Sequence, residues 1–109
     1  DDLVIGASTD TIPADGLIAT PGAFDIHVHF NSKELFEHAL ASGITTMFGG
    51  GFGGGATTCT PGPENTERFL QAAEEWPMNV GFYAKGNSSQ PGPIREQVEA
   101  FFARGEPAD

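Results

Sequence analysis

The stretch from Pro21 to Phe30 alternates apolar and polar residues strictly, and this pattern predicts a half-buried β-strand. The alternation assigns Phe24, Ile26, Val28 and Phe30 to one face, and Asp25, His27 and His29 to the other. Two residues of strand place the two histidine side chains roughly 6 to 7 Å apart on the same face. At that spacing two imidazoles can lean together onto one metal ion, with bonds of about 2.0 to 2.1 Å.

The polar face of this strand has a second interpretation, which the pattern leaves open. An amphipathic strand also uses its polar face to meet solvent or a neighbouring helix. The chain contains only three histidines, and two of them have this spacing, which favours the metal site. The third, His38, lies off the apolar face of a predicted helix beside Glu37, so we interpret it as a surface residue.

The remaining chain alternates predicted strands and helices. Strands are expected at residues 24–30, 44–48 and 78–84; one helix is expected after Phe30, one from Pro63, and one after Pro91. A strand, helix, strand order predicts a parallel α/β sheet. Short β-type runs at residues 3–6 and 16–20 predict an antiparallel pair before it. We therefore expect a β-rich segment at residues 1–22 and a β/α unit at residues 23–109.

Several segments, in order, resemble one protein family. The pattern Pro-Gly-x-x-Asp-x-His-x-His at residues 21–29 resembles the first metal motif of the amidohydrolase superfamily of metal-dependent barrel hydrolases. Within that superfamily, further segments resemble the large (alpha) subunits of urease; these are residues 41–51, 56–63, 85–87 and 95–100. The resemblance covers the chain from about Leu3 to about Ala100.

The resemblance implies the first three βα units of a TIM-type (β/α)8 barrel, preceded by a short antiparallel β segment. A complete barrel needs about 250 residues, so a chain of 109 residues is expected to form a partial barrel. The resemblance also implies hydrolysis of urea to ammonia and carbamate at two nickel ions in the complete enzyme. His27 and His29 would then be ligands of one nickel ion.

The other ligands of such a site are absent from this sequence. The resemblance implies a carbamylated bridging lysine in a Lys-x-His-Glu-Asp strand, and no such strand follows Ala100. We therefore assign no catalytic residue, and we expect the isolated chain to be inactive with at most one nickel ion partly ligated. One hypothesis is a piece of a urease alpha subunit, whose partners are urea, other urease subunits or the rest of the alpha subunit, and urease accessory proteins. The alternative is a shortened homologue that serves as a non-catalytic βα structural or binding module.

The glycine-rich segment at residues 49–55 is interpreted as a loop at the carboxyl end of a strand. It does not fit a phosphate-binding loop, because no Gly-Lys-Ser/Thr and no helix follow directly. The resemblance implies that the backbone carbonyl of Ala56 faces urea, although this loop is shorter than in the family and lacks the usual histidine before the alanine. Cys59 is interpreted as a small buried residue, and Lys85 as a non-catalytic residue at the site edge.

The charge balance limits the partners of the chain. Acidic residues outnumber basic ones by 15 to 5, for a net charge of −10, which argues against binding to nucleic acid. Such acidity also predicts a halophilic protein, because high salt screens self-repulsion. The sequence shows neither an apolar run of 18 residues nor a basic, apolar leader, so no membrane span is expected and the expected compartment is the cytoplasm.

Overall fold

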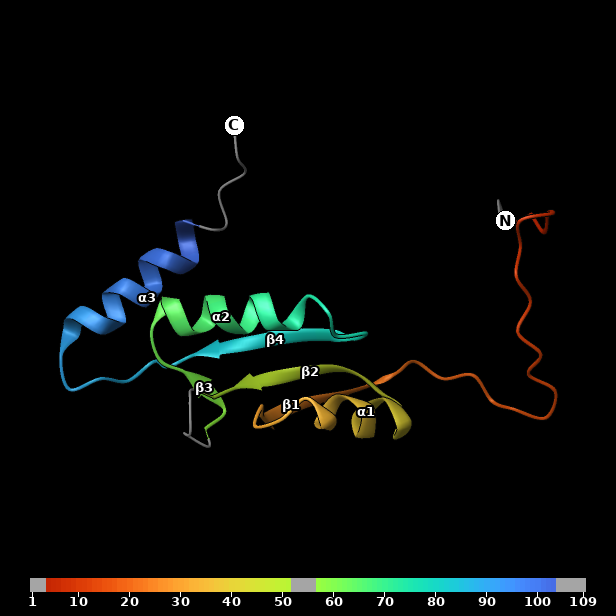
Figure 1. Cartoon of the computed structure of the whole chain (residues 1–109), viewed down its shortest axis with the longest axis horizontal. Helices are drawn as coiled ribbons and strands as arrows, with labels where there is room; N and C mark the ends of the chain where they lie inside the picture. Colours follow the sequence, from red (N-terminus) through yellow and green to blue (C-terminus); the bar gives the residue numbers. More distant parts are fainter. Residues whose placement is uncertain (1–3, 52–56, 104–109) are drawn as a thin grey trace.

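A four-stranded parallel sheet forms the centre of the computed structural model, which describes residues 4–51 and 57–103 (Figure 1). The strands are β1 (Ala23–His29), β2 (Ile44–Gly50), β3 (Cys59–Thr60) and β4 (Asn79–Ala84), in the spatial order β1-β2-β4-β3. β1 pairs with β2, and β2 pairs with the first four residues of β4. The two-residue strand β3, which the sequence did not predict, pairs with Tyr83 and Ala84.

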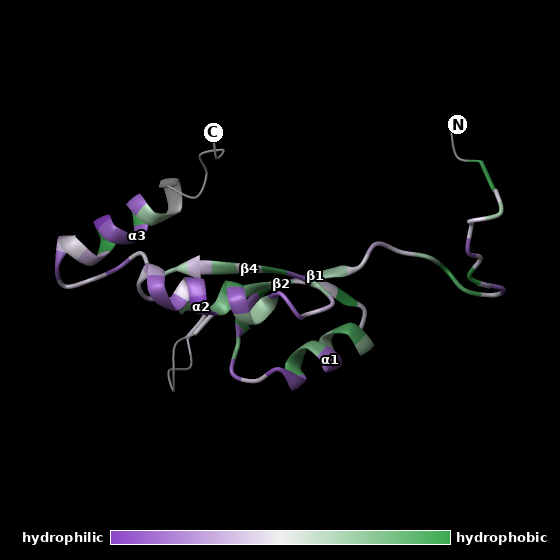
Figure 2. Cartoon of the chain, turned by 45° about the horizontal axis from the view of Figure 1, so that its top comes forward, coloured by the Kyte–Doolittle hydropathy of each residue, from purple (hydrophilic) through white to green (hydrophobic). Residues whose placement is uncertain are grey.

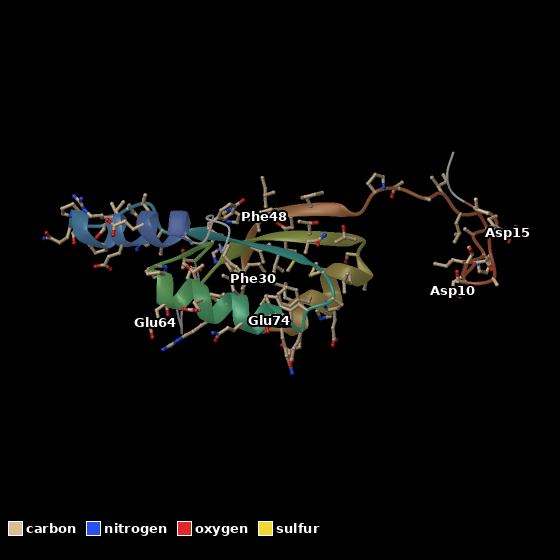
Figure 3. The ribbon with its side chains drawn as sticks, turned by 90° about the horizontal axis from the view of Figure 1, so that it is seen from above. Asp10, Asp15, Phe30, Phe48, Glu64 and Glu74 are labelled. Atoms are coloured by element: carbon tan, nitrogen blue, oxygen red, sulfur yellow. The ribbon has the colours of Figure 1, made fainter. Side chains whose placement is uncertain are left out.

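Three helices connect or follow these strands, and they are α1 (Glu34–Ala41), α2 (Pro63–Ala73) and α3 (Pro91–Ala103). α1 lies between β1 and β2 in the chain, and α2 precedes β4, so parallel strands are joined by helical crossovers. The helices α1 and α2 cover the same face of the sheet (Figures 1 and 3). The arrangement confirms the predicted α/β fold and matches part of a β/α barrel.

The core lies between the sheet and these two helices, and aromatic rings fill most of it. The buried apolar residues are Val28, Phe30, Phe36, Ala39 and Met47. The ring of Phe30 lies 5.7 Å from that of Phe36, 6.0 Å from Trp76 and 5.4 Å from Phe82, measured between centroids. Phe30, the first residue after β1, therefore packs against both α1 and β4.

Two glycines that the sequence assigned to a loop belong to β2. Gly49 and Gly50 are both buried, and a Cβ on Gly49 would overlap the backbone carbonyl of Val28. A Cβ on Gly50 would lie 2.8 Å from the carbonyl oxygen of Thr58. Glycine is needed here because neighbouring backbone comes too close for a side chain. Residues 52–55 of the expected loop lie outside the described residues.

The predicted antiparallel pair near the N-terminus is wrong for the described residues. Residues 4–22 contain no strand, and they extend away from the sheet as an arm with apolar stretches (Figures 1 and 2). Val4 is 86% exposed, and both Ile12 and Ile18 are 90% exposed. A two-stranded pair without an apolar surface to pack against is marginal in water, which explains the extended arm. The division at residue 22 stays a prediction.

The first helix begins later than its sequence suggested. Lys33 is its N-cap residue and makes no side-chain capping bond. Glu34 opens the helix, and a hydrogen bond from Ser32 together with one from its own backbone lowers the pKa of the Glu34 carboxyl. In residues 4–51 and 57–103, none of the helices combines the length with the apolar character that crossing a membrane requires.

Candidate metal centre

His27 and His29 lie side by side at the carboxyl end of β1. Their ring centroids are 5.5 Å apart, and the ring planes are inclined by 57°. His27 is exposed and His29 is half-buried, so both imidazoles can be reached from solvent. The carboxyl ends of parallel strands are the edge at which β/α barrels place their active sites. The structure thus brings together the two residues that the sequence singled out.

The register between β1 and β2 shifts at two points, once between Ala23 and Phe24 and once between Asp25 and Val28, next to the histidines. The pairing of β1 with β2 advances three residues on β1, from Asp25 to Val28, but only two on β2, from Met47 to Gly49. One extra residue is therefore accommodated in β1, as in a β-bulge. The strict alternation predicted for this strand does not persist through that point.

The bulge changes which apolar residues enter the core. Val28 and Phe30 are buried as expected, but Phe24 is 67% exposed and Ile26 is 66% exposed. The predicted single apolar face of four residues is thus wrong for its first half. An extra residue in one strand puts the alternation of side chains before it out of phase with the alternation after it. Residues that regular alternation would place on one face then lie on opposite faces.

Two side chains form hydrogen bonds with the backbone of the bulge. The backbone N–H of His27 donates to a carboxylate oxygen of Asp25 at 3.0 Å. The hydroxyl of Tyr83, on β4, donates to the backbone carbonyl of Ile26 at 3.2 Å. Sequence reasoning missed Tyr83, because nothing in the local pattern of β4 indicates a contact with a strand 57 residues earlier.

The chemistry of the histidine pair suits nickel, but the pair is not a complete ligand set. Imidazole is a good ligand for nickel and zinc. No group of three or more histidine, cysteine or carboxylate side chains that could hold a metal ion occurs in residues 4–51 and 57–103. The two rings alone would therefore hold one ion weakly, and a complete site needs further ligands.

The other predicted positions lie apart from this pair or outside the description. Ala56, the expected urea-facing residue, is not among the described residues. The His38 side chain is exposed on α1, as predicted for a surface residue. Cys59 is half-buried in β3, where its backbone N–H donates to the hydroxyl of Thr57 at 3.2 Å. Lys85 is exposed directly after β4.

Comparison with known proteins gives one consistent family. The chain matches the amidohydrolase family over residues 18–108. It is 83% identical over 100 residues to the urease subunit alpha of Haloquadratum walsbyi, which covers 92% of this chain and 18% of that protein. The corresponding protein of Natronomonas pharaonis is 79% identical over the same shares of the two chains. That of Haloarcula marismortui is 73% identical over 99 residues, or 91% of this chain and 17% of the relative.

The organisms and the lengths of these relatives are also informative. All three come from halophilic hosts, in agreement with the halophilic character predicted from the acidic composition. The chain spans about a fifth of the length of the curated relatives it matches.

Proposed function

The chain belongs to the amidohydrolase family, and on that premise we propose that it is part of the catalytic alpha subunit of a nickel-dependent urease. The observation that carries the proposal is the pair of imidazoles of His27 and His29, 5.5 Å apart at the carboxyl end of β1. In the complete enzyme the products would be ammonia and carbamate, formed from urea.

In this proposal His27 and His29 donate ring nitrogens to one of two nickel ions. When bound, nickel supplies Lewis-acid polarisation of the urea carbonyl. The chain itself positions the two rings at the carboxyl end of β1. The backbone carbonyl of Ala56 would accept a hydrogen bond from a urea amide. Further ligands must come from beyond the described residues, because these contain no group of three donors.

The same premise assigns partners and a location. We propose that the chain works with the other urease subunits and with accessory proteins that deliver nickel, in the cytoplasm. Residues 1–22 would belong to a β-rich region beside the barrel, and residues 23–109 to the barrel itself. The exposed apolar side chains of the N-terminal arm support such a division, since isolated chains seldom leave them in water.

A nickel titration of the chain and of matched histidine variants tests the metal assignment. Nickel binding should weaken at least tenfold in His27→Ala and in His29→Ala, because each change removes one of two ligands. His38→Ala is the control, since it removes the exposed imidazole on α1 and should leave the affinity unchanged. Equal nickel affinity in all three variants and the parent chain would refute the proposed site.

The alternative is a βα module without catalysis, and the absence of a third metal donor among the described residues favours it. Urease activity measured after mixing the chain with nickel, the rest of the alpha subunit and the other subunits separates the two functions. Activity that depends on His27 and His29 supports the enzyme. Full binding of the other subunits without activity, and without any effect of the histidine variants, supports the module.

A further inference from the structure

The peptide unit between Ile26 and His27 has both of its polar groups bonded by side chains. Its N–H, from His27, donates to the Asp25 carboxylate at 3.0 Å, and its carbonyl, from Ile26, accepts from the Tyr83 hydroxyl at 3.2 Å. This unit lies within the bulge, where the register between β1 and β2 is interrupted. Two side chains thus take the place of ladder partners for one peptide unit.

Tyr83 reaches this unit from β4, across the intervening strand β2. The sheet order places β2 between β1 and β4. The ring of Tyr83 stacks on Phe48 of β2, with centroids 6.1 Å apart and planes inclined by 27°. Phe48 lies on the side of the sheet away from α2, whereas Phe30 lies on the helix side (Figure 3). The tyrosine therefore crosses the face of the sheet that the helices leave uncovered.

The orientation of a peptide unit sets the direction of the side chain that follows it. A β-bulge redirects side chains, and its unpaired backbone groups need other partners. His27 carries the N–H of this unit, so rotating the unit would move its imidazole relative to His29. The two bonds hold the unit from opposite ends, since one engages the N–H and the other the carbonyl.

We propose that Tyr83 and Asp25 are positioning residues, which fix the bulge of β1 and thereby hold the His27 imidazole beside that of His29. The metal-binding consequence rests on the proposed function, whereas the geometric consequence does not. Tyr83 would also make ring orientation depend on β4, so that correct pairing of three strands is required before the histidines converge.

The test uses variants of the 109-residue chain that remove one bond each. Tyr83→Phe deletes the hydroxyl and keeps the ring that stacks on Phe48. Asp25→Ala deletes the acceptor, and Asp25→Asn restores an oxygen at the same place. Ser42→Ala is the matched control, because the Ser42 hydroxyl also donates to a backbone carbonyl, that of His38, at 2.8 Å.

Two readouts are taken on each variant: nuclear Overhauser contacts between the His27 and His29 rings without metal, and nickel affinity by titration. We expect Tyr83→Phe and Asp25→Ala to lose the ring contacts and to bind nickel about tenfold more weakly, at the low end for partners of metal ligands. Asp25→Asn should retain most of both properties. Ser42→Ala should match the parent chain.

The results distinguish positioning from simple stabilisation and from the metal assignment. A lower melting temperature in Tyr83→Phe with unchanged ring contacts would overturn the proposal, because a merely structural bond acts in that way. If the parent chain shows no nickel binding even at weak affinity, the metal assignment in the proposed function fails, but loss of the ring contacts in Tyr83→Phe still supports positioning. If nickel binds and Tyr83→Phe binds it equally, with its ring contacts intact, positioning fails and the metal site stands.

Discussion

The side-chain amide of Gln97 forms two hydrogen bonds with the backbone of Lys85, one through each of its polar atoms. Its oxygen accepts from the Lys85 N–H at 3.0 Å, and its nitrogen donates to the Lys85 carbonyl at 2.8 Å. A glutamine of α3 thus acts as a strand partner for the residue that follows β4. The same N–H also lies 3.0 Å from the carbonyl of Thr60, so three segments meet at this residue.

Replacing Gln97 should release α3 from the end of β4. Gln97→Ala removes both bonds and is expected to lower the free energy of unfolding by about 1 to 3 kcal/mol. Hydrogen exchange at the Lys85 amide should accelerate, which mass spectrometry or NMR can measure. Gln71→Ala, an exposed glutamine change on α2, serves as the control. The pairing would be contradicted by an unchanged free energy of unfolding in Gln97→Ala together with an unchanged exchange rate at Lys85, whose N–H can still donate to the Thr60 carbonyl.

Gly49→Ala should disrupt the contact between β1 and β2. The added Cβ would overlap the Val28 carbonyl, which is backbone and cannot rotate away. We expect a loss of about 3 kcal/mol or more of folding free energy, at the upper range for single changes, measured by urea denaturation. Gly86→Ala is the matched control, because a Cβ there meets nothing within 4 Å. Similar midpoints for both variants would show that the strands do not approach as described.

Phe30 and Phe24 are expected to respond very differently to truncation, although the sequence pattern placed them on one face. Phe30→Ala empties a site surrounded by aromatic rings and should cost about 3 to 5 kcal/mol. Phe24→Ala removes a ring that is 67% exposed, so a change within about 0.5 kcal/mol is expected. Thermal unfolding followed by circular dichroism measures both. Equal losses would mean that the bulge does not redirect the first half of β1.

Stability should rise with salt because the chain carries a net charge of −10. The Debye length falls from about 10 Å at 0.1 M to about 3 Å at 1 M salt, which screens repulsion between acidic side chains. We expect the melting temperature to increase between about 0.1 M and 2 M potassium chloride. Sucrose is the control, since it favours burial without screening charge. A melting temperature that is the same at both salt concentrations would refute the electrostatic explanation.

Much of this architecture could be predicted from local sequence. The three main strands, the helix beginning at Pro63 and the parallel order follow from apolar periodicity and from proline and glycine positions. The histidine pair was also visible, because residues two apart on a strand point the same way. These features depend on neighbours in the chain, so the chain itself specifies them.

Other features required the folded chain. The N-terminal arm has strand-like composition but no strand in residues 4–22, because strand formation needs a partner surface. Likewise, Gly49 and Gly50 belong to β2 and not to the expected loop. The backbone of Val28 lies close to Gly49 and that of Thr58 close to Gly50, so neither position has room for a side chain. No local pattern contains that information.

The sequence by itself determined which residues carry metal-binding chemistry and that they share a strand. The tertiary structure decided where the register of that strand with β2 is interrupted, and it brought to that point the hydroxyl of Tyr83, 57 residues after Ile26. The physical reason is that side-chain spacing is set by covalent geometry, whereas register and cross-strand bonds are set by which segments pack together.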